Sequence, residues 1–464
     1  MKLVELFLLL SIFSLLFFGC DDKMEFVPGP NAPDPTFDVK FPYIEINTLG
    51  NFIQDEPKSN ATMRVFEIKD DSIEILNYQG NIGIEIRGSS SQTFDKKSFG
   101  LETRTADNID LDTSIFNMPN EEDWILNGPY SDKSLIRNVL IYELSNEMGR
   151  YASRTKLSEL YIDNDYEGVY VFMEKLKRDN DRIAISKLQP EENEGEDLTG
   201  GYIIKIDKAS GNGGSSLNYT DYNSFSSAYN IDGETTIIPQ THFLYDYPDE
   251  DAISTEQRSY ISGYMSEFED ALAGPDYKDE ELGYRKYIDV SSFVDFFILN
   301  EFSHNPDAYR LSTYMYKDKN EKLTIGPVWD FNLALGNCDY CNGGEPNNWM
   351  YRFNEYCPND AWQVPFWWKR LLSDPYFSDM VKIRYTELRA NILNLTSVNA
   401  IIDDHVYQLE SAGAIYRNFQ KHPILSTYVW PNRNIGGSYP NEIQYLKSWI
   451  SQRVSWMDSN VPLL

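Results

Sequence analysis

Two aspartates in the stretch from Asn300 to Asn337 have the setting of functional carboxylates. Asp307 lies in a short polar break that follows an apolar run with helical character. Asp330 follows the second strand of a predicted hairpin, and a hairpin can bring the residues before and after it to one rim of a pocket. Because a carboxylate can accept a proton or bind a divalent cation, the pair predicts a site of acid–base or metal chemistry.

A second candidate region spans residues 87–103, where a strand ends at Arg87 and a serine-rich loop leads to Lys96 and Lys97. Small residues in a loop, followed by lysine on a strand, can cover and neutralise phosphates. The same residues also fit a plain hairpin with an exposed lysine pair, and both interpretations stay open. The chain has no GxxxxGK[ST] motif and no GxGxxG after a strand, which argues against a P-loop NTPase or a dinucleotide-binding enzyme.

Glu174 ends a strand of mostly apolar residues, 168–174. A carboxylate at this place is either a surface group at the end of the strand or a pocket acid that pairs with Lys97. The residues alone do not decide between the two.

The composition restricts the kind of partner. The chain has 464 residues, with 41 Lys and Arg against 72 Asp and Glu and a net charge of −31. Binding to nucleic acid needs clustered basic residues, so we expect no nucleic-acid partner. The aromatic content of 14% is high, and exposed aromatic residues often stack on sugars or contact partner proteins, so a glycan partner stays possible.

The N-terminus indicates export. Residues 6–18 form an apolar run that is too short to span a membrane stably and ends at Gly19-Cys20. This pattern resembles a bacterial lipoprotein signal, in which Cys20 becomes lipidated and anchors the protein in the membrane. The alternative is a plain secretory signal, and either one predicts that the protein leaves the cytoplasm; the lipoprotein signal predicts a location in the cell envelope. A segment rich in Pro and Asp, 21–40, is typical of a flexible tether.

Three further cysteines follow the Asp330 segment: Cys338, Cys341 and Cys357. An exported chain can oxidise them, but three cysteines cannot all pair within one chain. A local disulfide between Cys338 and Cys341 and a set of free thiols both fit. Zinc is not favoured, because no second cysteine pair or histidine cluster completes four ligands.

The periodicity predicts an α+β fold with two lobes. Alternating apolar residues from Phe41 onward predict a β-rich N-terminal lobe over 41–205. Apolar residues at three- and four-residue spacing predict helices in a C-terminal lobe over 206–395, which contains the 300–337 stretch. A helical segment over 396–464 is expected to cap the second lobe.

Five blocks in order resemble the CotH kinase family, over roughly residues 82–390. The blocks are RGSSSQTFDKKSFGLE, WILNGPYSDKSLIRNVLIYELSNEMG, ELYIDNDYEGVYVFMEKLKRD, GGYIIKID and PDAYRLSTYMYKDKNEKLTIGPVWDFNLALGN. The resemblance implies an atypical protein-kinase-like fold with a mainly β N-terminal lobe and a mainly helical C-terminal lobe. It also implies ATP with Mg²⁺ or Mn²⁺ as cofactors and phosphorylation of protein Ser or Thr hydroxyls.

The resemblance assigns the nucleotide-binding role to the first lobe. Arg87 begins the block that supplies Lys97, or its neighbour Lys96, as the lysine that contacts phosphate. Glu174 would lie at the wall of the pocket, either as the ion-pair partner of that lysine or near the adenine.

The resemblance assigns the chemistry to the second lobe. Asp307 would accept the proton of the substrate hydroxyl, and Asp330 would hold the metal ion. Ser312 stands where family members commonly have a metal-binding Asn, and Asn332 where they often have Asp. Both replacements keep an oxygen atom but offer a weaker ligand.

Two functions follow as hypotheses. The first is a membrane-anchored protein Ser/Thr kinase of the cell envelope with a protein substrate. The second is a catalytically inactive CotH-like surface protein that binds protein or glycan partners.

Overall fold

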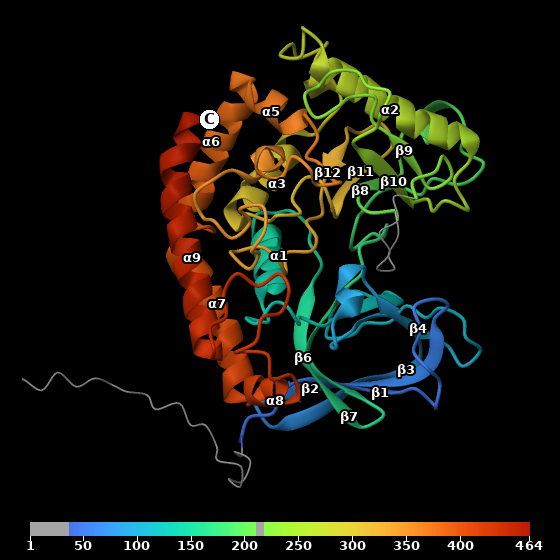
Figure 1. Ribbon diagram of the computed structural model, residues 1–464. Helices are drawn as coiled ribbons and strands as arrows, with labels where there is room; N and C mark the ends of the chain where they lie inside the picture. The colour runs from blue at the N-terminus through green and yellow to red at the C-terminus, as the bar shows by residue number, and fades with distance from the viewer. Residues whose placement is uncertain (1–36, 210–217) are drawn as a thin grey trace, which may run out of the picture. The chain divides into compact units, whose positions relative to one another are not determined.

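The computed structural model describes residues 37–209 and 218–464 (Figure 1). Residues 38–464 form one unit. The predicted signal segment 1–20 with Cys20, and most of the predicted tether 21–40, lie outside the described residues. None of the described helices is both long and apolar enough to cross a membrane.

The first half of this unit is a closed β-barrel with strand order β1-β2-β3-β4-β5-β7-β6. Strands β1 and β6 close the barrel in parallel, whereas the other neighbouring strands are antiparallel. Apolar residues two positions apart, such as Ile44 and Ile46 or Ile82 and Ile84, point inward and form one buried core. The strands are β1 (Tyr43–Asn47), β2 (Ser59–Lys69), β3 (Ile73–Arg87), β4 (Ser98–Arg104), β5 (Asp123–Asn127), β6 (Thr155–Ile162) and β7 (Asp165–Glu174).

The long strand β3 contains an irregularity in its pairing with β2. Its register against β2 pairs Leu76 with Phe66 and Tyr78 with Val65, so Asn77 has no partner in the ladder. The extra residue is a β-bulge, which interrupts the alternation of the side chains without ending the strand. The sequence pattern therefore breaks where the strand continues.

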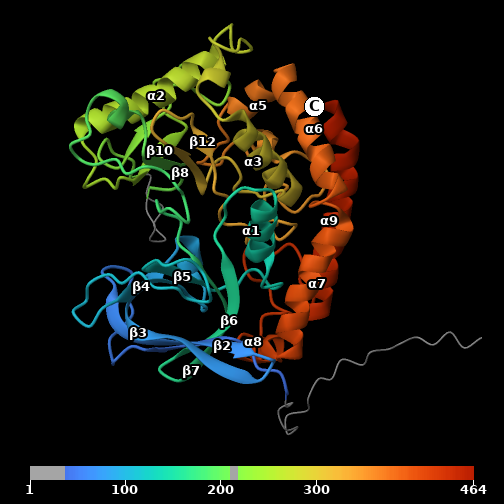
Figure 2. The ribbon, with the colours of Figure 1, turned by 180° about the vertical axis from the view of Figure 1, so that it is seen from behind.

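The second half contains an antiparallel sheet with strand order β12-β11-β8-β10-β9, and helices surround it (Figures 1 and 2). The predicted hairpin that separates the two aspartates is confirmed as β11 and β12. The strands are β8 (Tyr202–Ile206), β9 (Ser224–Ser226), β10 (His242–Tyr247), β11 (Thr313–Lys317) and β12 (Thr324–Ile325). The helices are α1 (Arg137–Glu147), α2 (Thr255–Ala273), α3 (Val290–Ser303), α4 (Phe353–Tyr356), α5 (Trp367–Leu372), α6 (Pro375–Ala390), α7 (Leu395–Ser411), α8 (Ala414–Lys421) and α9 (Tyr439–Asn460).

The α+β class is confirmed, but strand β8 lies on the other side of the expected lobe boundary. We assigned residues up to 205 to the N-terminal lobe, whereas β8 pairs with β10 and β11 in the second sheet. The barrel ends with β7, and residues 175–201 connect the two halves. Strand patterns do not reveal which sheet a strand joins, because each sheet needs the same alternation.

Helix α3 is buried almost throughout and forms the centre of the second half. A helix that is apolar on all sides belongs inside a core. Its rings Phe296 and Phe297 pack on Trp368, at centroid distances of 6.0 Å each. The helix ends at His304, whose left-handed backbone (φ 49°) turns the chain toward Asp307.

The C-terminal helices α7, α8 and α9 span both halves rather than cap the second lobe alone, as Figures 1 and 2 show. Asn418 on α8 accepts the N–H of Val169 on β7 at 3.0 Å. Arg417 forms an ion pair with the buried Glu159 of β6 at 2.8 Å. These contacts tie the end of the chain to the barrel and correct the predicted arrangement.

Candidate active site

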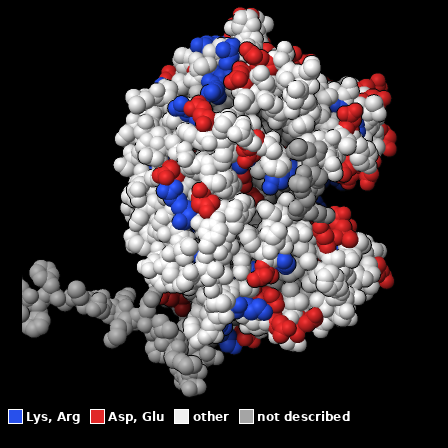
Figure 3. All heavy atoms as spheres, in the orientation of Figure 1, with Lys and Arg blue, Asp and Glu red and all other residues white. Residues whose placement is uncertain are grey.

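A cleft between the barrel and the second sheet holds a cavity of about 510 Å³, within the usual size range of ligand pockets. In Figure 3 the molecule is notched on its right-hand side between the two halves, with acidic residues on both rims. A neighbouring cavity of about 830 Å³ shares part of the wall, including Arg87, Lys205 and Trp329. The charged residues that line the first cavity include Arg87, Lys205, Asp207, Lys208, Asp307 and Asp330.

Asp330 lies in the loop after β12, and helix α1 holds this loop. The backbone N–H of Asp330 donates to the hydroxyl oxygen of Tyr142 at 3.1 Å, and that of Phe331 donates to Oδ1 of Asn138 at 2.6 Å. Asp330 has a left-handed backbone (φ 62°), which is uncommon for a residue with a side chain and is enriched at functional sites. The loop thus aims the carboxylate into the cavity.

Asp307 lies in the turn that follows α3, and its backbone N–H donates to the side-chain oxygen of Asn305 at 3.2 Å. Its Oδ1 accepts a hydrogen bond from Nη2 of Arg310 at 2.9 Å. Asn305 also donates to the carbonyl oxygen of Asp330 at 3.4 Å, so one amide bridges the two aspartate loops. The structure therefore brings Asp307 and Asp330 to the same cavity, as the hairpin argument predicted.

A third carboxylate, Asp207, joins them from the end of β8. Its Oδ1 accepts the N–H of Lys208 at 2.8 Å, and its carboxylate also accepts the N–H of Ser312. Ser312, a predicted metal ligand, lines the cavity and has a left-handed backbone (φ 47°). Burial raises the pKa of Asp207, although Lys205 and these two N–H groups oppose the shift.

The three carboxylates repel one another. Burial in the cleft raises the pKa of Asp330 to about 7, and the charges of Asp307 and Asp207 add to the effect. Lys208 and Arg87 act in the opposite direction but do not compensate. A divalent cation would offset this repulsion, because hard cations bind carboxylate oxygens.

Arg87 faces this group from the end of β3. Its guanidinium lies 5.7 Å from the ring centroid of Trp329, and it forms no hydrogen bond or ion pair with any residue in the described ranges. Burial lowers its pKa, while Tyr314 and Asp330 oppose the shift. Its donors thus remain available to an anionic ligand.

Lys205 and Lys208 add positive charge from the second sheet. Lys205 forms an ion pair with Asp246 at 2.7 Å. Burial alone would lower the pKa of Lys205, but Asp246, Tyr314 and Asp207 together outweigh this effect and the pKa is raised. Lys208 lies with its Nζ 5.2 Å from the ring centroid of Trp362.

Lys96 and Lys97, the predicted phosphate ligands, are not among the residues that line the cavity. Nζ of Lys96 donates to the Val169 carbonyl at 2.5 Å and to Asn418 at 2.9 Å, inside the contact between barrel and α8. Nζ of Lys97 donates to two carbonyl oxygens of its own loop, at 2.8 and 2.5 Å. Both ammonium groups thus have protein oxygens as acceptors.

Glu174 is buried, and its carboxylate forms an ion pair with Arg154 at 2.5 Å. The pair with Lys97, one of the two alternatives from the sequence, does not form. Arg182 lies 3.8 Å away, and the hydroxyl of Tyr151 donates to the carboxylate at 3.1 Å. The cavity is lined instead by its neighbours Met173 and Lys175, because strand side chains alternate between the two faces. Glu174 therefore braces the end of β7.

Asn332, another predicted metal ligand, lines the cavity two residues after Asp330. Its carbonyl oxygen accepts a hydrogen bond from the side chain of Asn337 at 2.8 Å. This hydrogen bond holds the backbone of the loop at Asn332.

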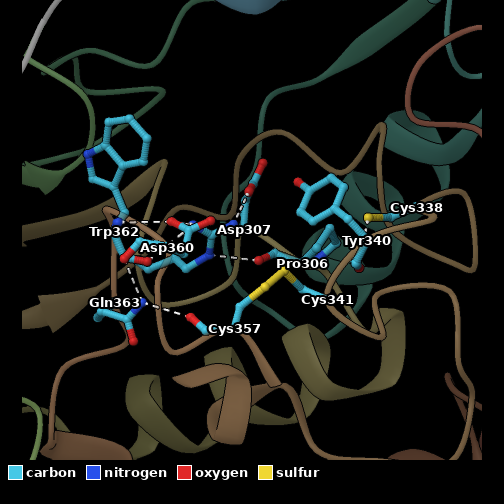
Figure 4. The surroundings of a disulfide bond; sticks show 10 residues. Pro306, Asp307, Cys338, Tyr340, Cys341, Cys357, Asp360, Trp362 and Gln363 are labelled. Atoms are coloured by element: carbon cyan, nitrogen blue, oxygen red, sulfur yellow. Dashed lines mark hydrogen bonds and ion pairs between the residues drawn. A yellow bond between two sulfur atoms is a disulfide. The ribbon is translucent and has the colours of Figure 1, made fainter. Parts of the chain in front are cut away.

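The disulfide joins Cys341 to Cys357, and Cys338 is a buried free thiol. The sequence left a local pair of Cys338 and Cys341 and free thiols open, and the structure has neither alternative in full: Cys341 is paired with Cys357, and Cys338 alone is free. Figure 4 shows the disulfide below the Asp307 loop, with Cys338 beside Tyr340. Burial raises the pKa of the Cys338 thiol to about 12.

A separate acidic group borders the neighbouring cavity. Asp112, Glu121 and Glu122 have carboxylate oxygens within 4.8 Å of one another. Lys177 forms ion pairs with Glu121 at 2.9 Å and with Glu122 at 2.7 Å. Arg182 adds a pair with Glu121 at 3.1 Å, so protein cations already neutralise much of this group.

Sequence reasoning missed Lys205, Asp207 and Lys208. Their signal was present in the block GGYIIKIDK, where Lys205 and Asp207 stand two residues apart on an otherwise apolar strand. Residues two apart share one face of a strand, so two charges there predict a polar cavity beside that face.

The family model described as CotH kinase protein matches residues 84–457, which is most of the chain. The protein therefore belongs to the CotH kinase family, and the match extends beyond the five blocks into helix α9. Comparison with curated proteins finds no significant match.

Proposed function

We propose that this protein is an atypical protein kinase that transfers the γ-phosphoryl group of ATP to Ser or Thr hydroxyls of a protein substrate. The observation that carries the proposal is the convergence of Asp207, Asp307 and Asp330 on one cavity whose walls also hold Arg87, Lys205 and Lys208. Phosphoryl transfer relies on positioned cations and carboxylates rather than on covalent chemistry by the protein.

Asp330 and Asp207 would hold a divalent metal ion, with Ser312 and Asn332 as further oxygen donors. The fit rests on the four oxygen-bearing side chains that line the same cavity, and the raised pKa of Asp330 agrees with carboxylates held close together without a cation. Carboxylate, amide and hydroxyl oxygens suit Mg²⁺ or Mn²⁺, which would neutralise the charge of the nucleotide phosphates.

Arg87, Lys205 and Lys208 would bind the phosphates from both sides of the cleft. Arg87 is suited to two parallel hydrogen bonds with one phosphate group. The neighbouring cavity, which is bordered by Trp329 and by residues of the connection between the two halves, offers space for the base and sugar.

Asp307 would accept the proton of the acceptor hydroxyl as the phosphoryl group moves to that oxygen. Its Oδ1 is occupied by Arg310, whereas no residue within the described ranges donates to Oδ2. One carboxylate oxygen is therefore oriented and the other is left to accept the proton.

The rival function is a catalytically inactive module that binds protein or glycan. Its support is Ser312 and Asn332, which replace stronger metal ligands. Asp207 weighs against it, because a third carboxylate supplies the negative charge that those two residues lack. We therefore favour the enzyme.

The proposed place of action is the cell envelope, with the protein anchored in the membrane through a lipidated Cys20. The net charge of −31 supports a protein substrate rather than nucleic acid.

Thermal unfolding of the full-length chain with ATP and Mn²⁺ tests the proposal, together with transfer of labelled phosphate to added proteins. Ligand at 100 times its dissociation constant adds about 2.7 kcal/mol of stability. We expect this shift in the wild type, none in Asp330→Asn, and an unchanged shift in the control Lys97→Met. A wild type that shows no shift contradicts the nucleotide site, and a shift without any transfer supports the inactive module.

A further inference from the structure

Arg310 is a buried cation that contacts the Asp307 turn at two points. Besides the hydrogen bond from Nη2 to Asp307, its Nε donates to the carbonyl oxygen of Pro306 at 2.9 Å. Its side chain is only 2% exposed, and its guanidinium lies 4.0 Å from the ring centroid of Phe353. The guanidinium therefore fixes both the backbone and the carboxylate of the turn.

A second carboxylate holds the other end of this guanidinium. Nη1 of Arg310 donates to Oδ1 of Asp360 at 3.1 Å and to the carbonyl oxygen of Trp362 at 3.3 Å. The same Asp360 oxygen accepts the N–H of Trp362 at 2.9 Å.

The loop that carries Asp360, residues 357–363, is closed at both ends. Its first residue, Cys357, is bonded to Cys341. Its last residue, Gln363, donates from Nε2 to the carbonyl oxygens of Cys357 at 3.0 Å and of Asp360 at 2.7 Å. Asp360 thus has a fixed position in a part of the chain that has little regular structure.

The same loop also supports Asp207. The indole N–H of Trp362 donates to the hydroxyl oxygen of Tyr219 at 2.9 Å. That hydroxyl donates in turn to the carbonyl oxygen of Asp207 at 2.8 Å. One loop therefore contacts the supports of two of the three carboxylates.

We infer that Asp360 and Arg310 are positioning residues for Asp307, and that the disulfide-closed loop 357–363 sets the geometry of the base. The inference rests on the proposed kinase function. Asp360 does not line the cavity, and its connection to Asp307 runs through Arg310. A base that is displaced by about 1 Å can lower the rate about 100-fold without weakening the binding of substrate elsewhere.

The decisive variant is Asp360→Ala, measured in the full-length protein beside Glu355→Ala. Glu355 is a matched control, because it forms an exposed ion pair with Arg352 at 2.6 Å close to the same disulfide. We expect Asp360→Ala to lower kcat for phosphoryl transfer at least tenfold and to leave KM for ATP within about twofold. Glu355→Ala should change neither value.

Two further variants keep the test informative if Asp360→Ala proves unstable. Arg310→Lys keeps the positive charge but loses the planar fork, and should reproduce the selective loss of kcat. The double variant Cys341→Ser/Cys357→Ser releases the first residue of the loop from residue 341 and should also lower kcat. Variants that lower kcat and raise KM for ATP together would overturn the positioning role in favour of general loss of structure.

Hydrogen exchange of residues 304–312 separates this inference from the proposed function. Faster exchange in Asp360→Ala than in Glu355→Ala is expected whether or not the protein transfers phosphate. Equal exchange in the two variants would show that Asp360 does not hold the Asp307 turn through Arg310. Faster exchange with an unchanged kcat overturns its role in positioning the base, and a wild type without any transfer contradicts the kinase function alone.

Discussion

Asp330 and Tyr142 lie 188 positions apart in the sequence, and the backbone N–H of Asp330 donates to the Tyr142 hydroxyl oxygen over 3.1 Å. One turn earlier on α1, Asn138 accepts the N–H of Phe331. Helix α1 comes from the region between the barrel strands β5 and β6, so an element of the first half of the chain fixes the aspartate loop of the second.

The Tyr142→Phe variant should destabilise the Asp330 loop. The change leaves the Asp330 N–H without its acceptor, and an unsatisfied buried donor costs about 1–3 kcal/mol. We expect a loss of this size in denaturant unfolding, and a smaller stabilisation by ATP and Mn²⁺. The control is Tyr407→Phe, because Tyr407 is 70% exposed. Equal stability of Tyr142→Phe and the wild type would show that the hydrogen bond contributes nothing.

Arg87, and not Lys97, should determine the affinity for nucleotide. A hydrogen bond to a charged group contributes about 1.5–3 kcal/mol, which corresponds to about 10- to 100-fold in affinity. We expect Arg87→Met to weaken ATP binding by this factor in calorimetric titration, and Lys97→Met to leave it within about twofold. The opposite order would return the phosphate-binding role to the lysine.

Asp207→Asn should weaken metal binding. The charge of the ligand set tunes the affinity for divalent cations, and we expect the loss of one carboxylate to reduce Mn²⁺ affinity about tenfold or more. Asp112→Asn is the control, because Asp112 belongs to the acidic group that Lys177 neutralises. If Asp112→Asn has the larger effect, the metal site lies at that group.

Glu269 should make the stability depend on pH. It is buried, and it accepts hydrogen bonds from the hydroxyl of Ser227 at 2.7 Å and from the indole of Trp367 at 2.9 Å. Burial raises its pKa from 4.5 to about 7, so the folded state binds the proton more tightly than the unfolded state does. The stability contributed by this proton is fully present below pH 4.5 and is lost as the pH rises through 7.

Glu269→Gln removes this titration. Relative to the wild type, the variant should gain stability as the pH rises from 4.5 to 7, by at most about 1.4 kcal/mol per pH unit. The free energy of unfolding at a series of pH values measures the effect. Parallel curves for the two proteins would assign the pH dependence to other groups.

The spacing of apolar residues predicted a helix or strand well where its burial depends on its own residues. The buried helix α3, the hairpin of β11 and β12, and the meeting of Asp307 and Asp330 all follow from short-range spacing. The helices α5 and α6 lie within the region 206–395, and α8 and α9 within 396–464, where helices were predicted.

The errors concern groups whose partners are distant in the sequence. Lys96 looks like a phosphate ligand until Asn418, 322 positions away, is brought beside it. Glu174 likewise pairs with Arg154, and Cys341 with Cys357, and spacing does not reveal either partner. The resemblance to the family supplied the proposed roles of Asp307 and Asp330, but it did not indicate Asp207 as the third carboxylate of the site.

Asn418 also affects when the barrel can complete its folding during synthesis. Its side-chain oxygen accepts both the ammonium of Lys96 at 2.9 Å and the N–H of Val169 at 3.0 Å, and it lies close to the C-terminal end of the chain. A growing polypeptide can pair every strand of the barrel well before this residue is synthesised, yet the Lys96 ammonium then still lacks one of its two acceptors. The barrel is therefore finished only after α8 has been synthesised, and a chain that stops before α8 carries an incomplete first half as well.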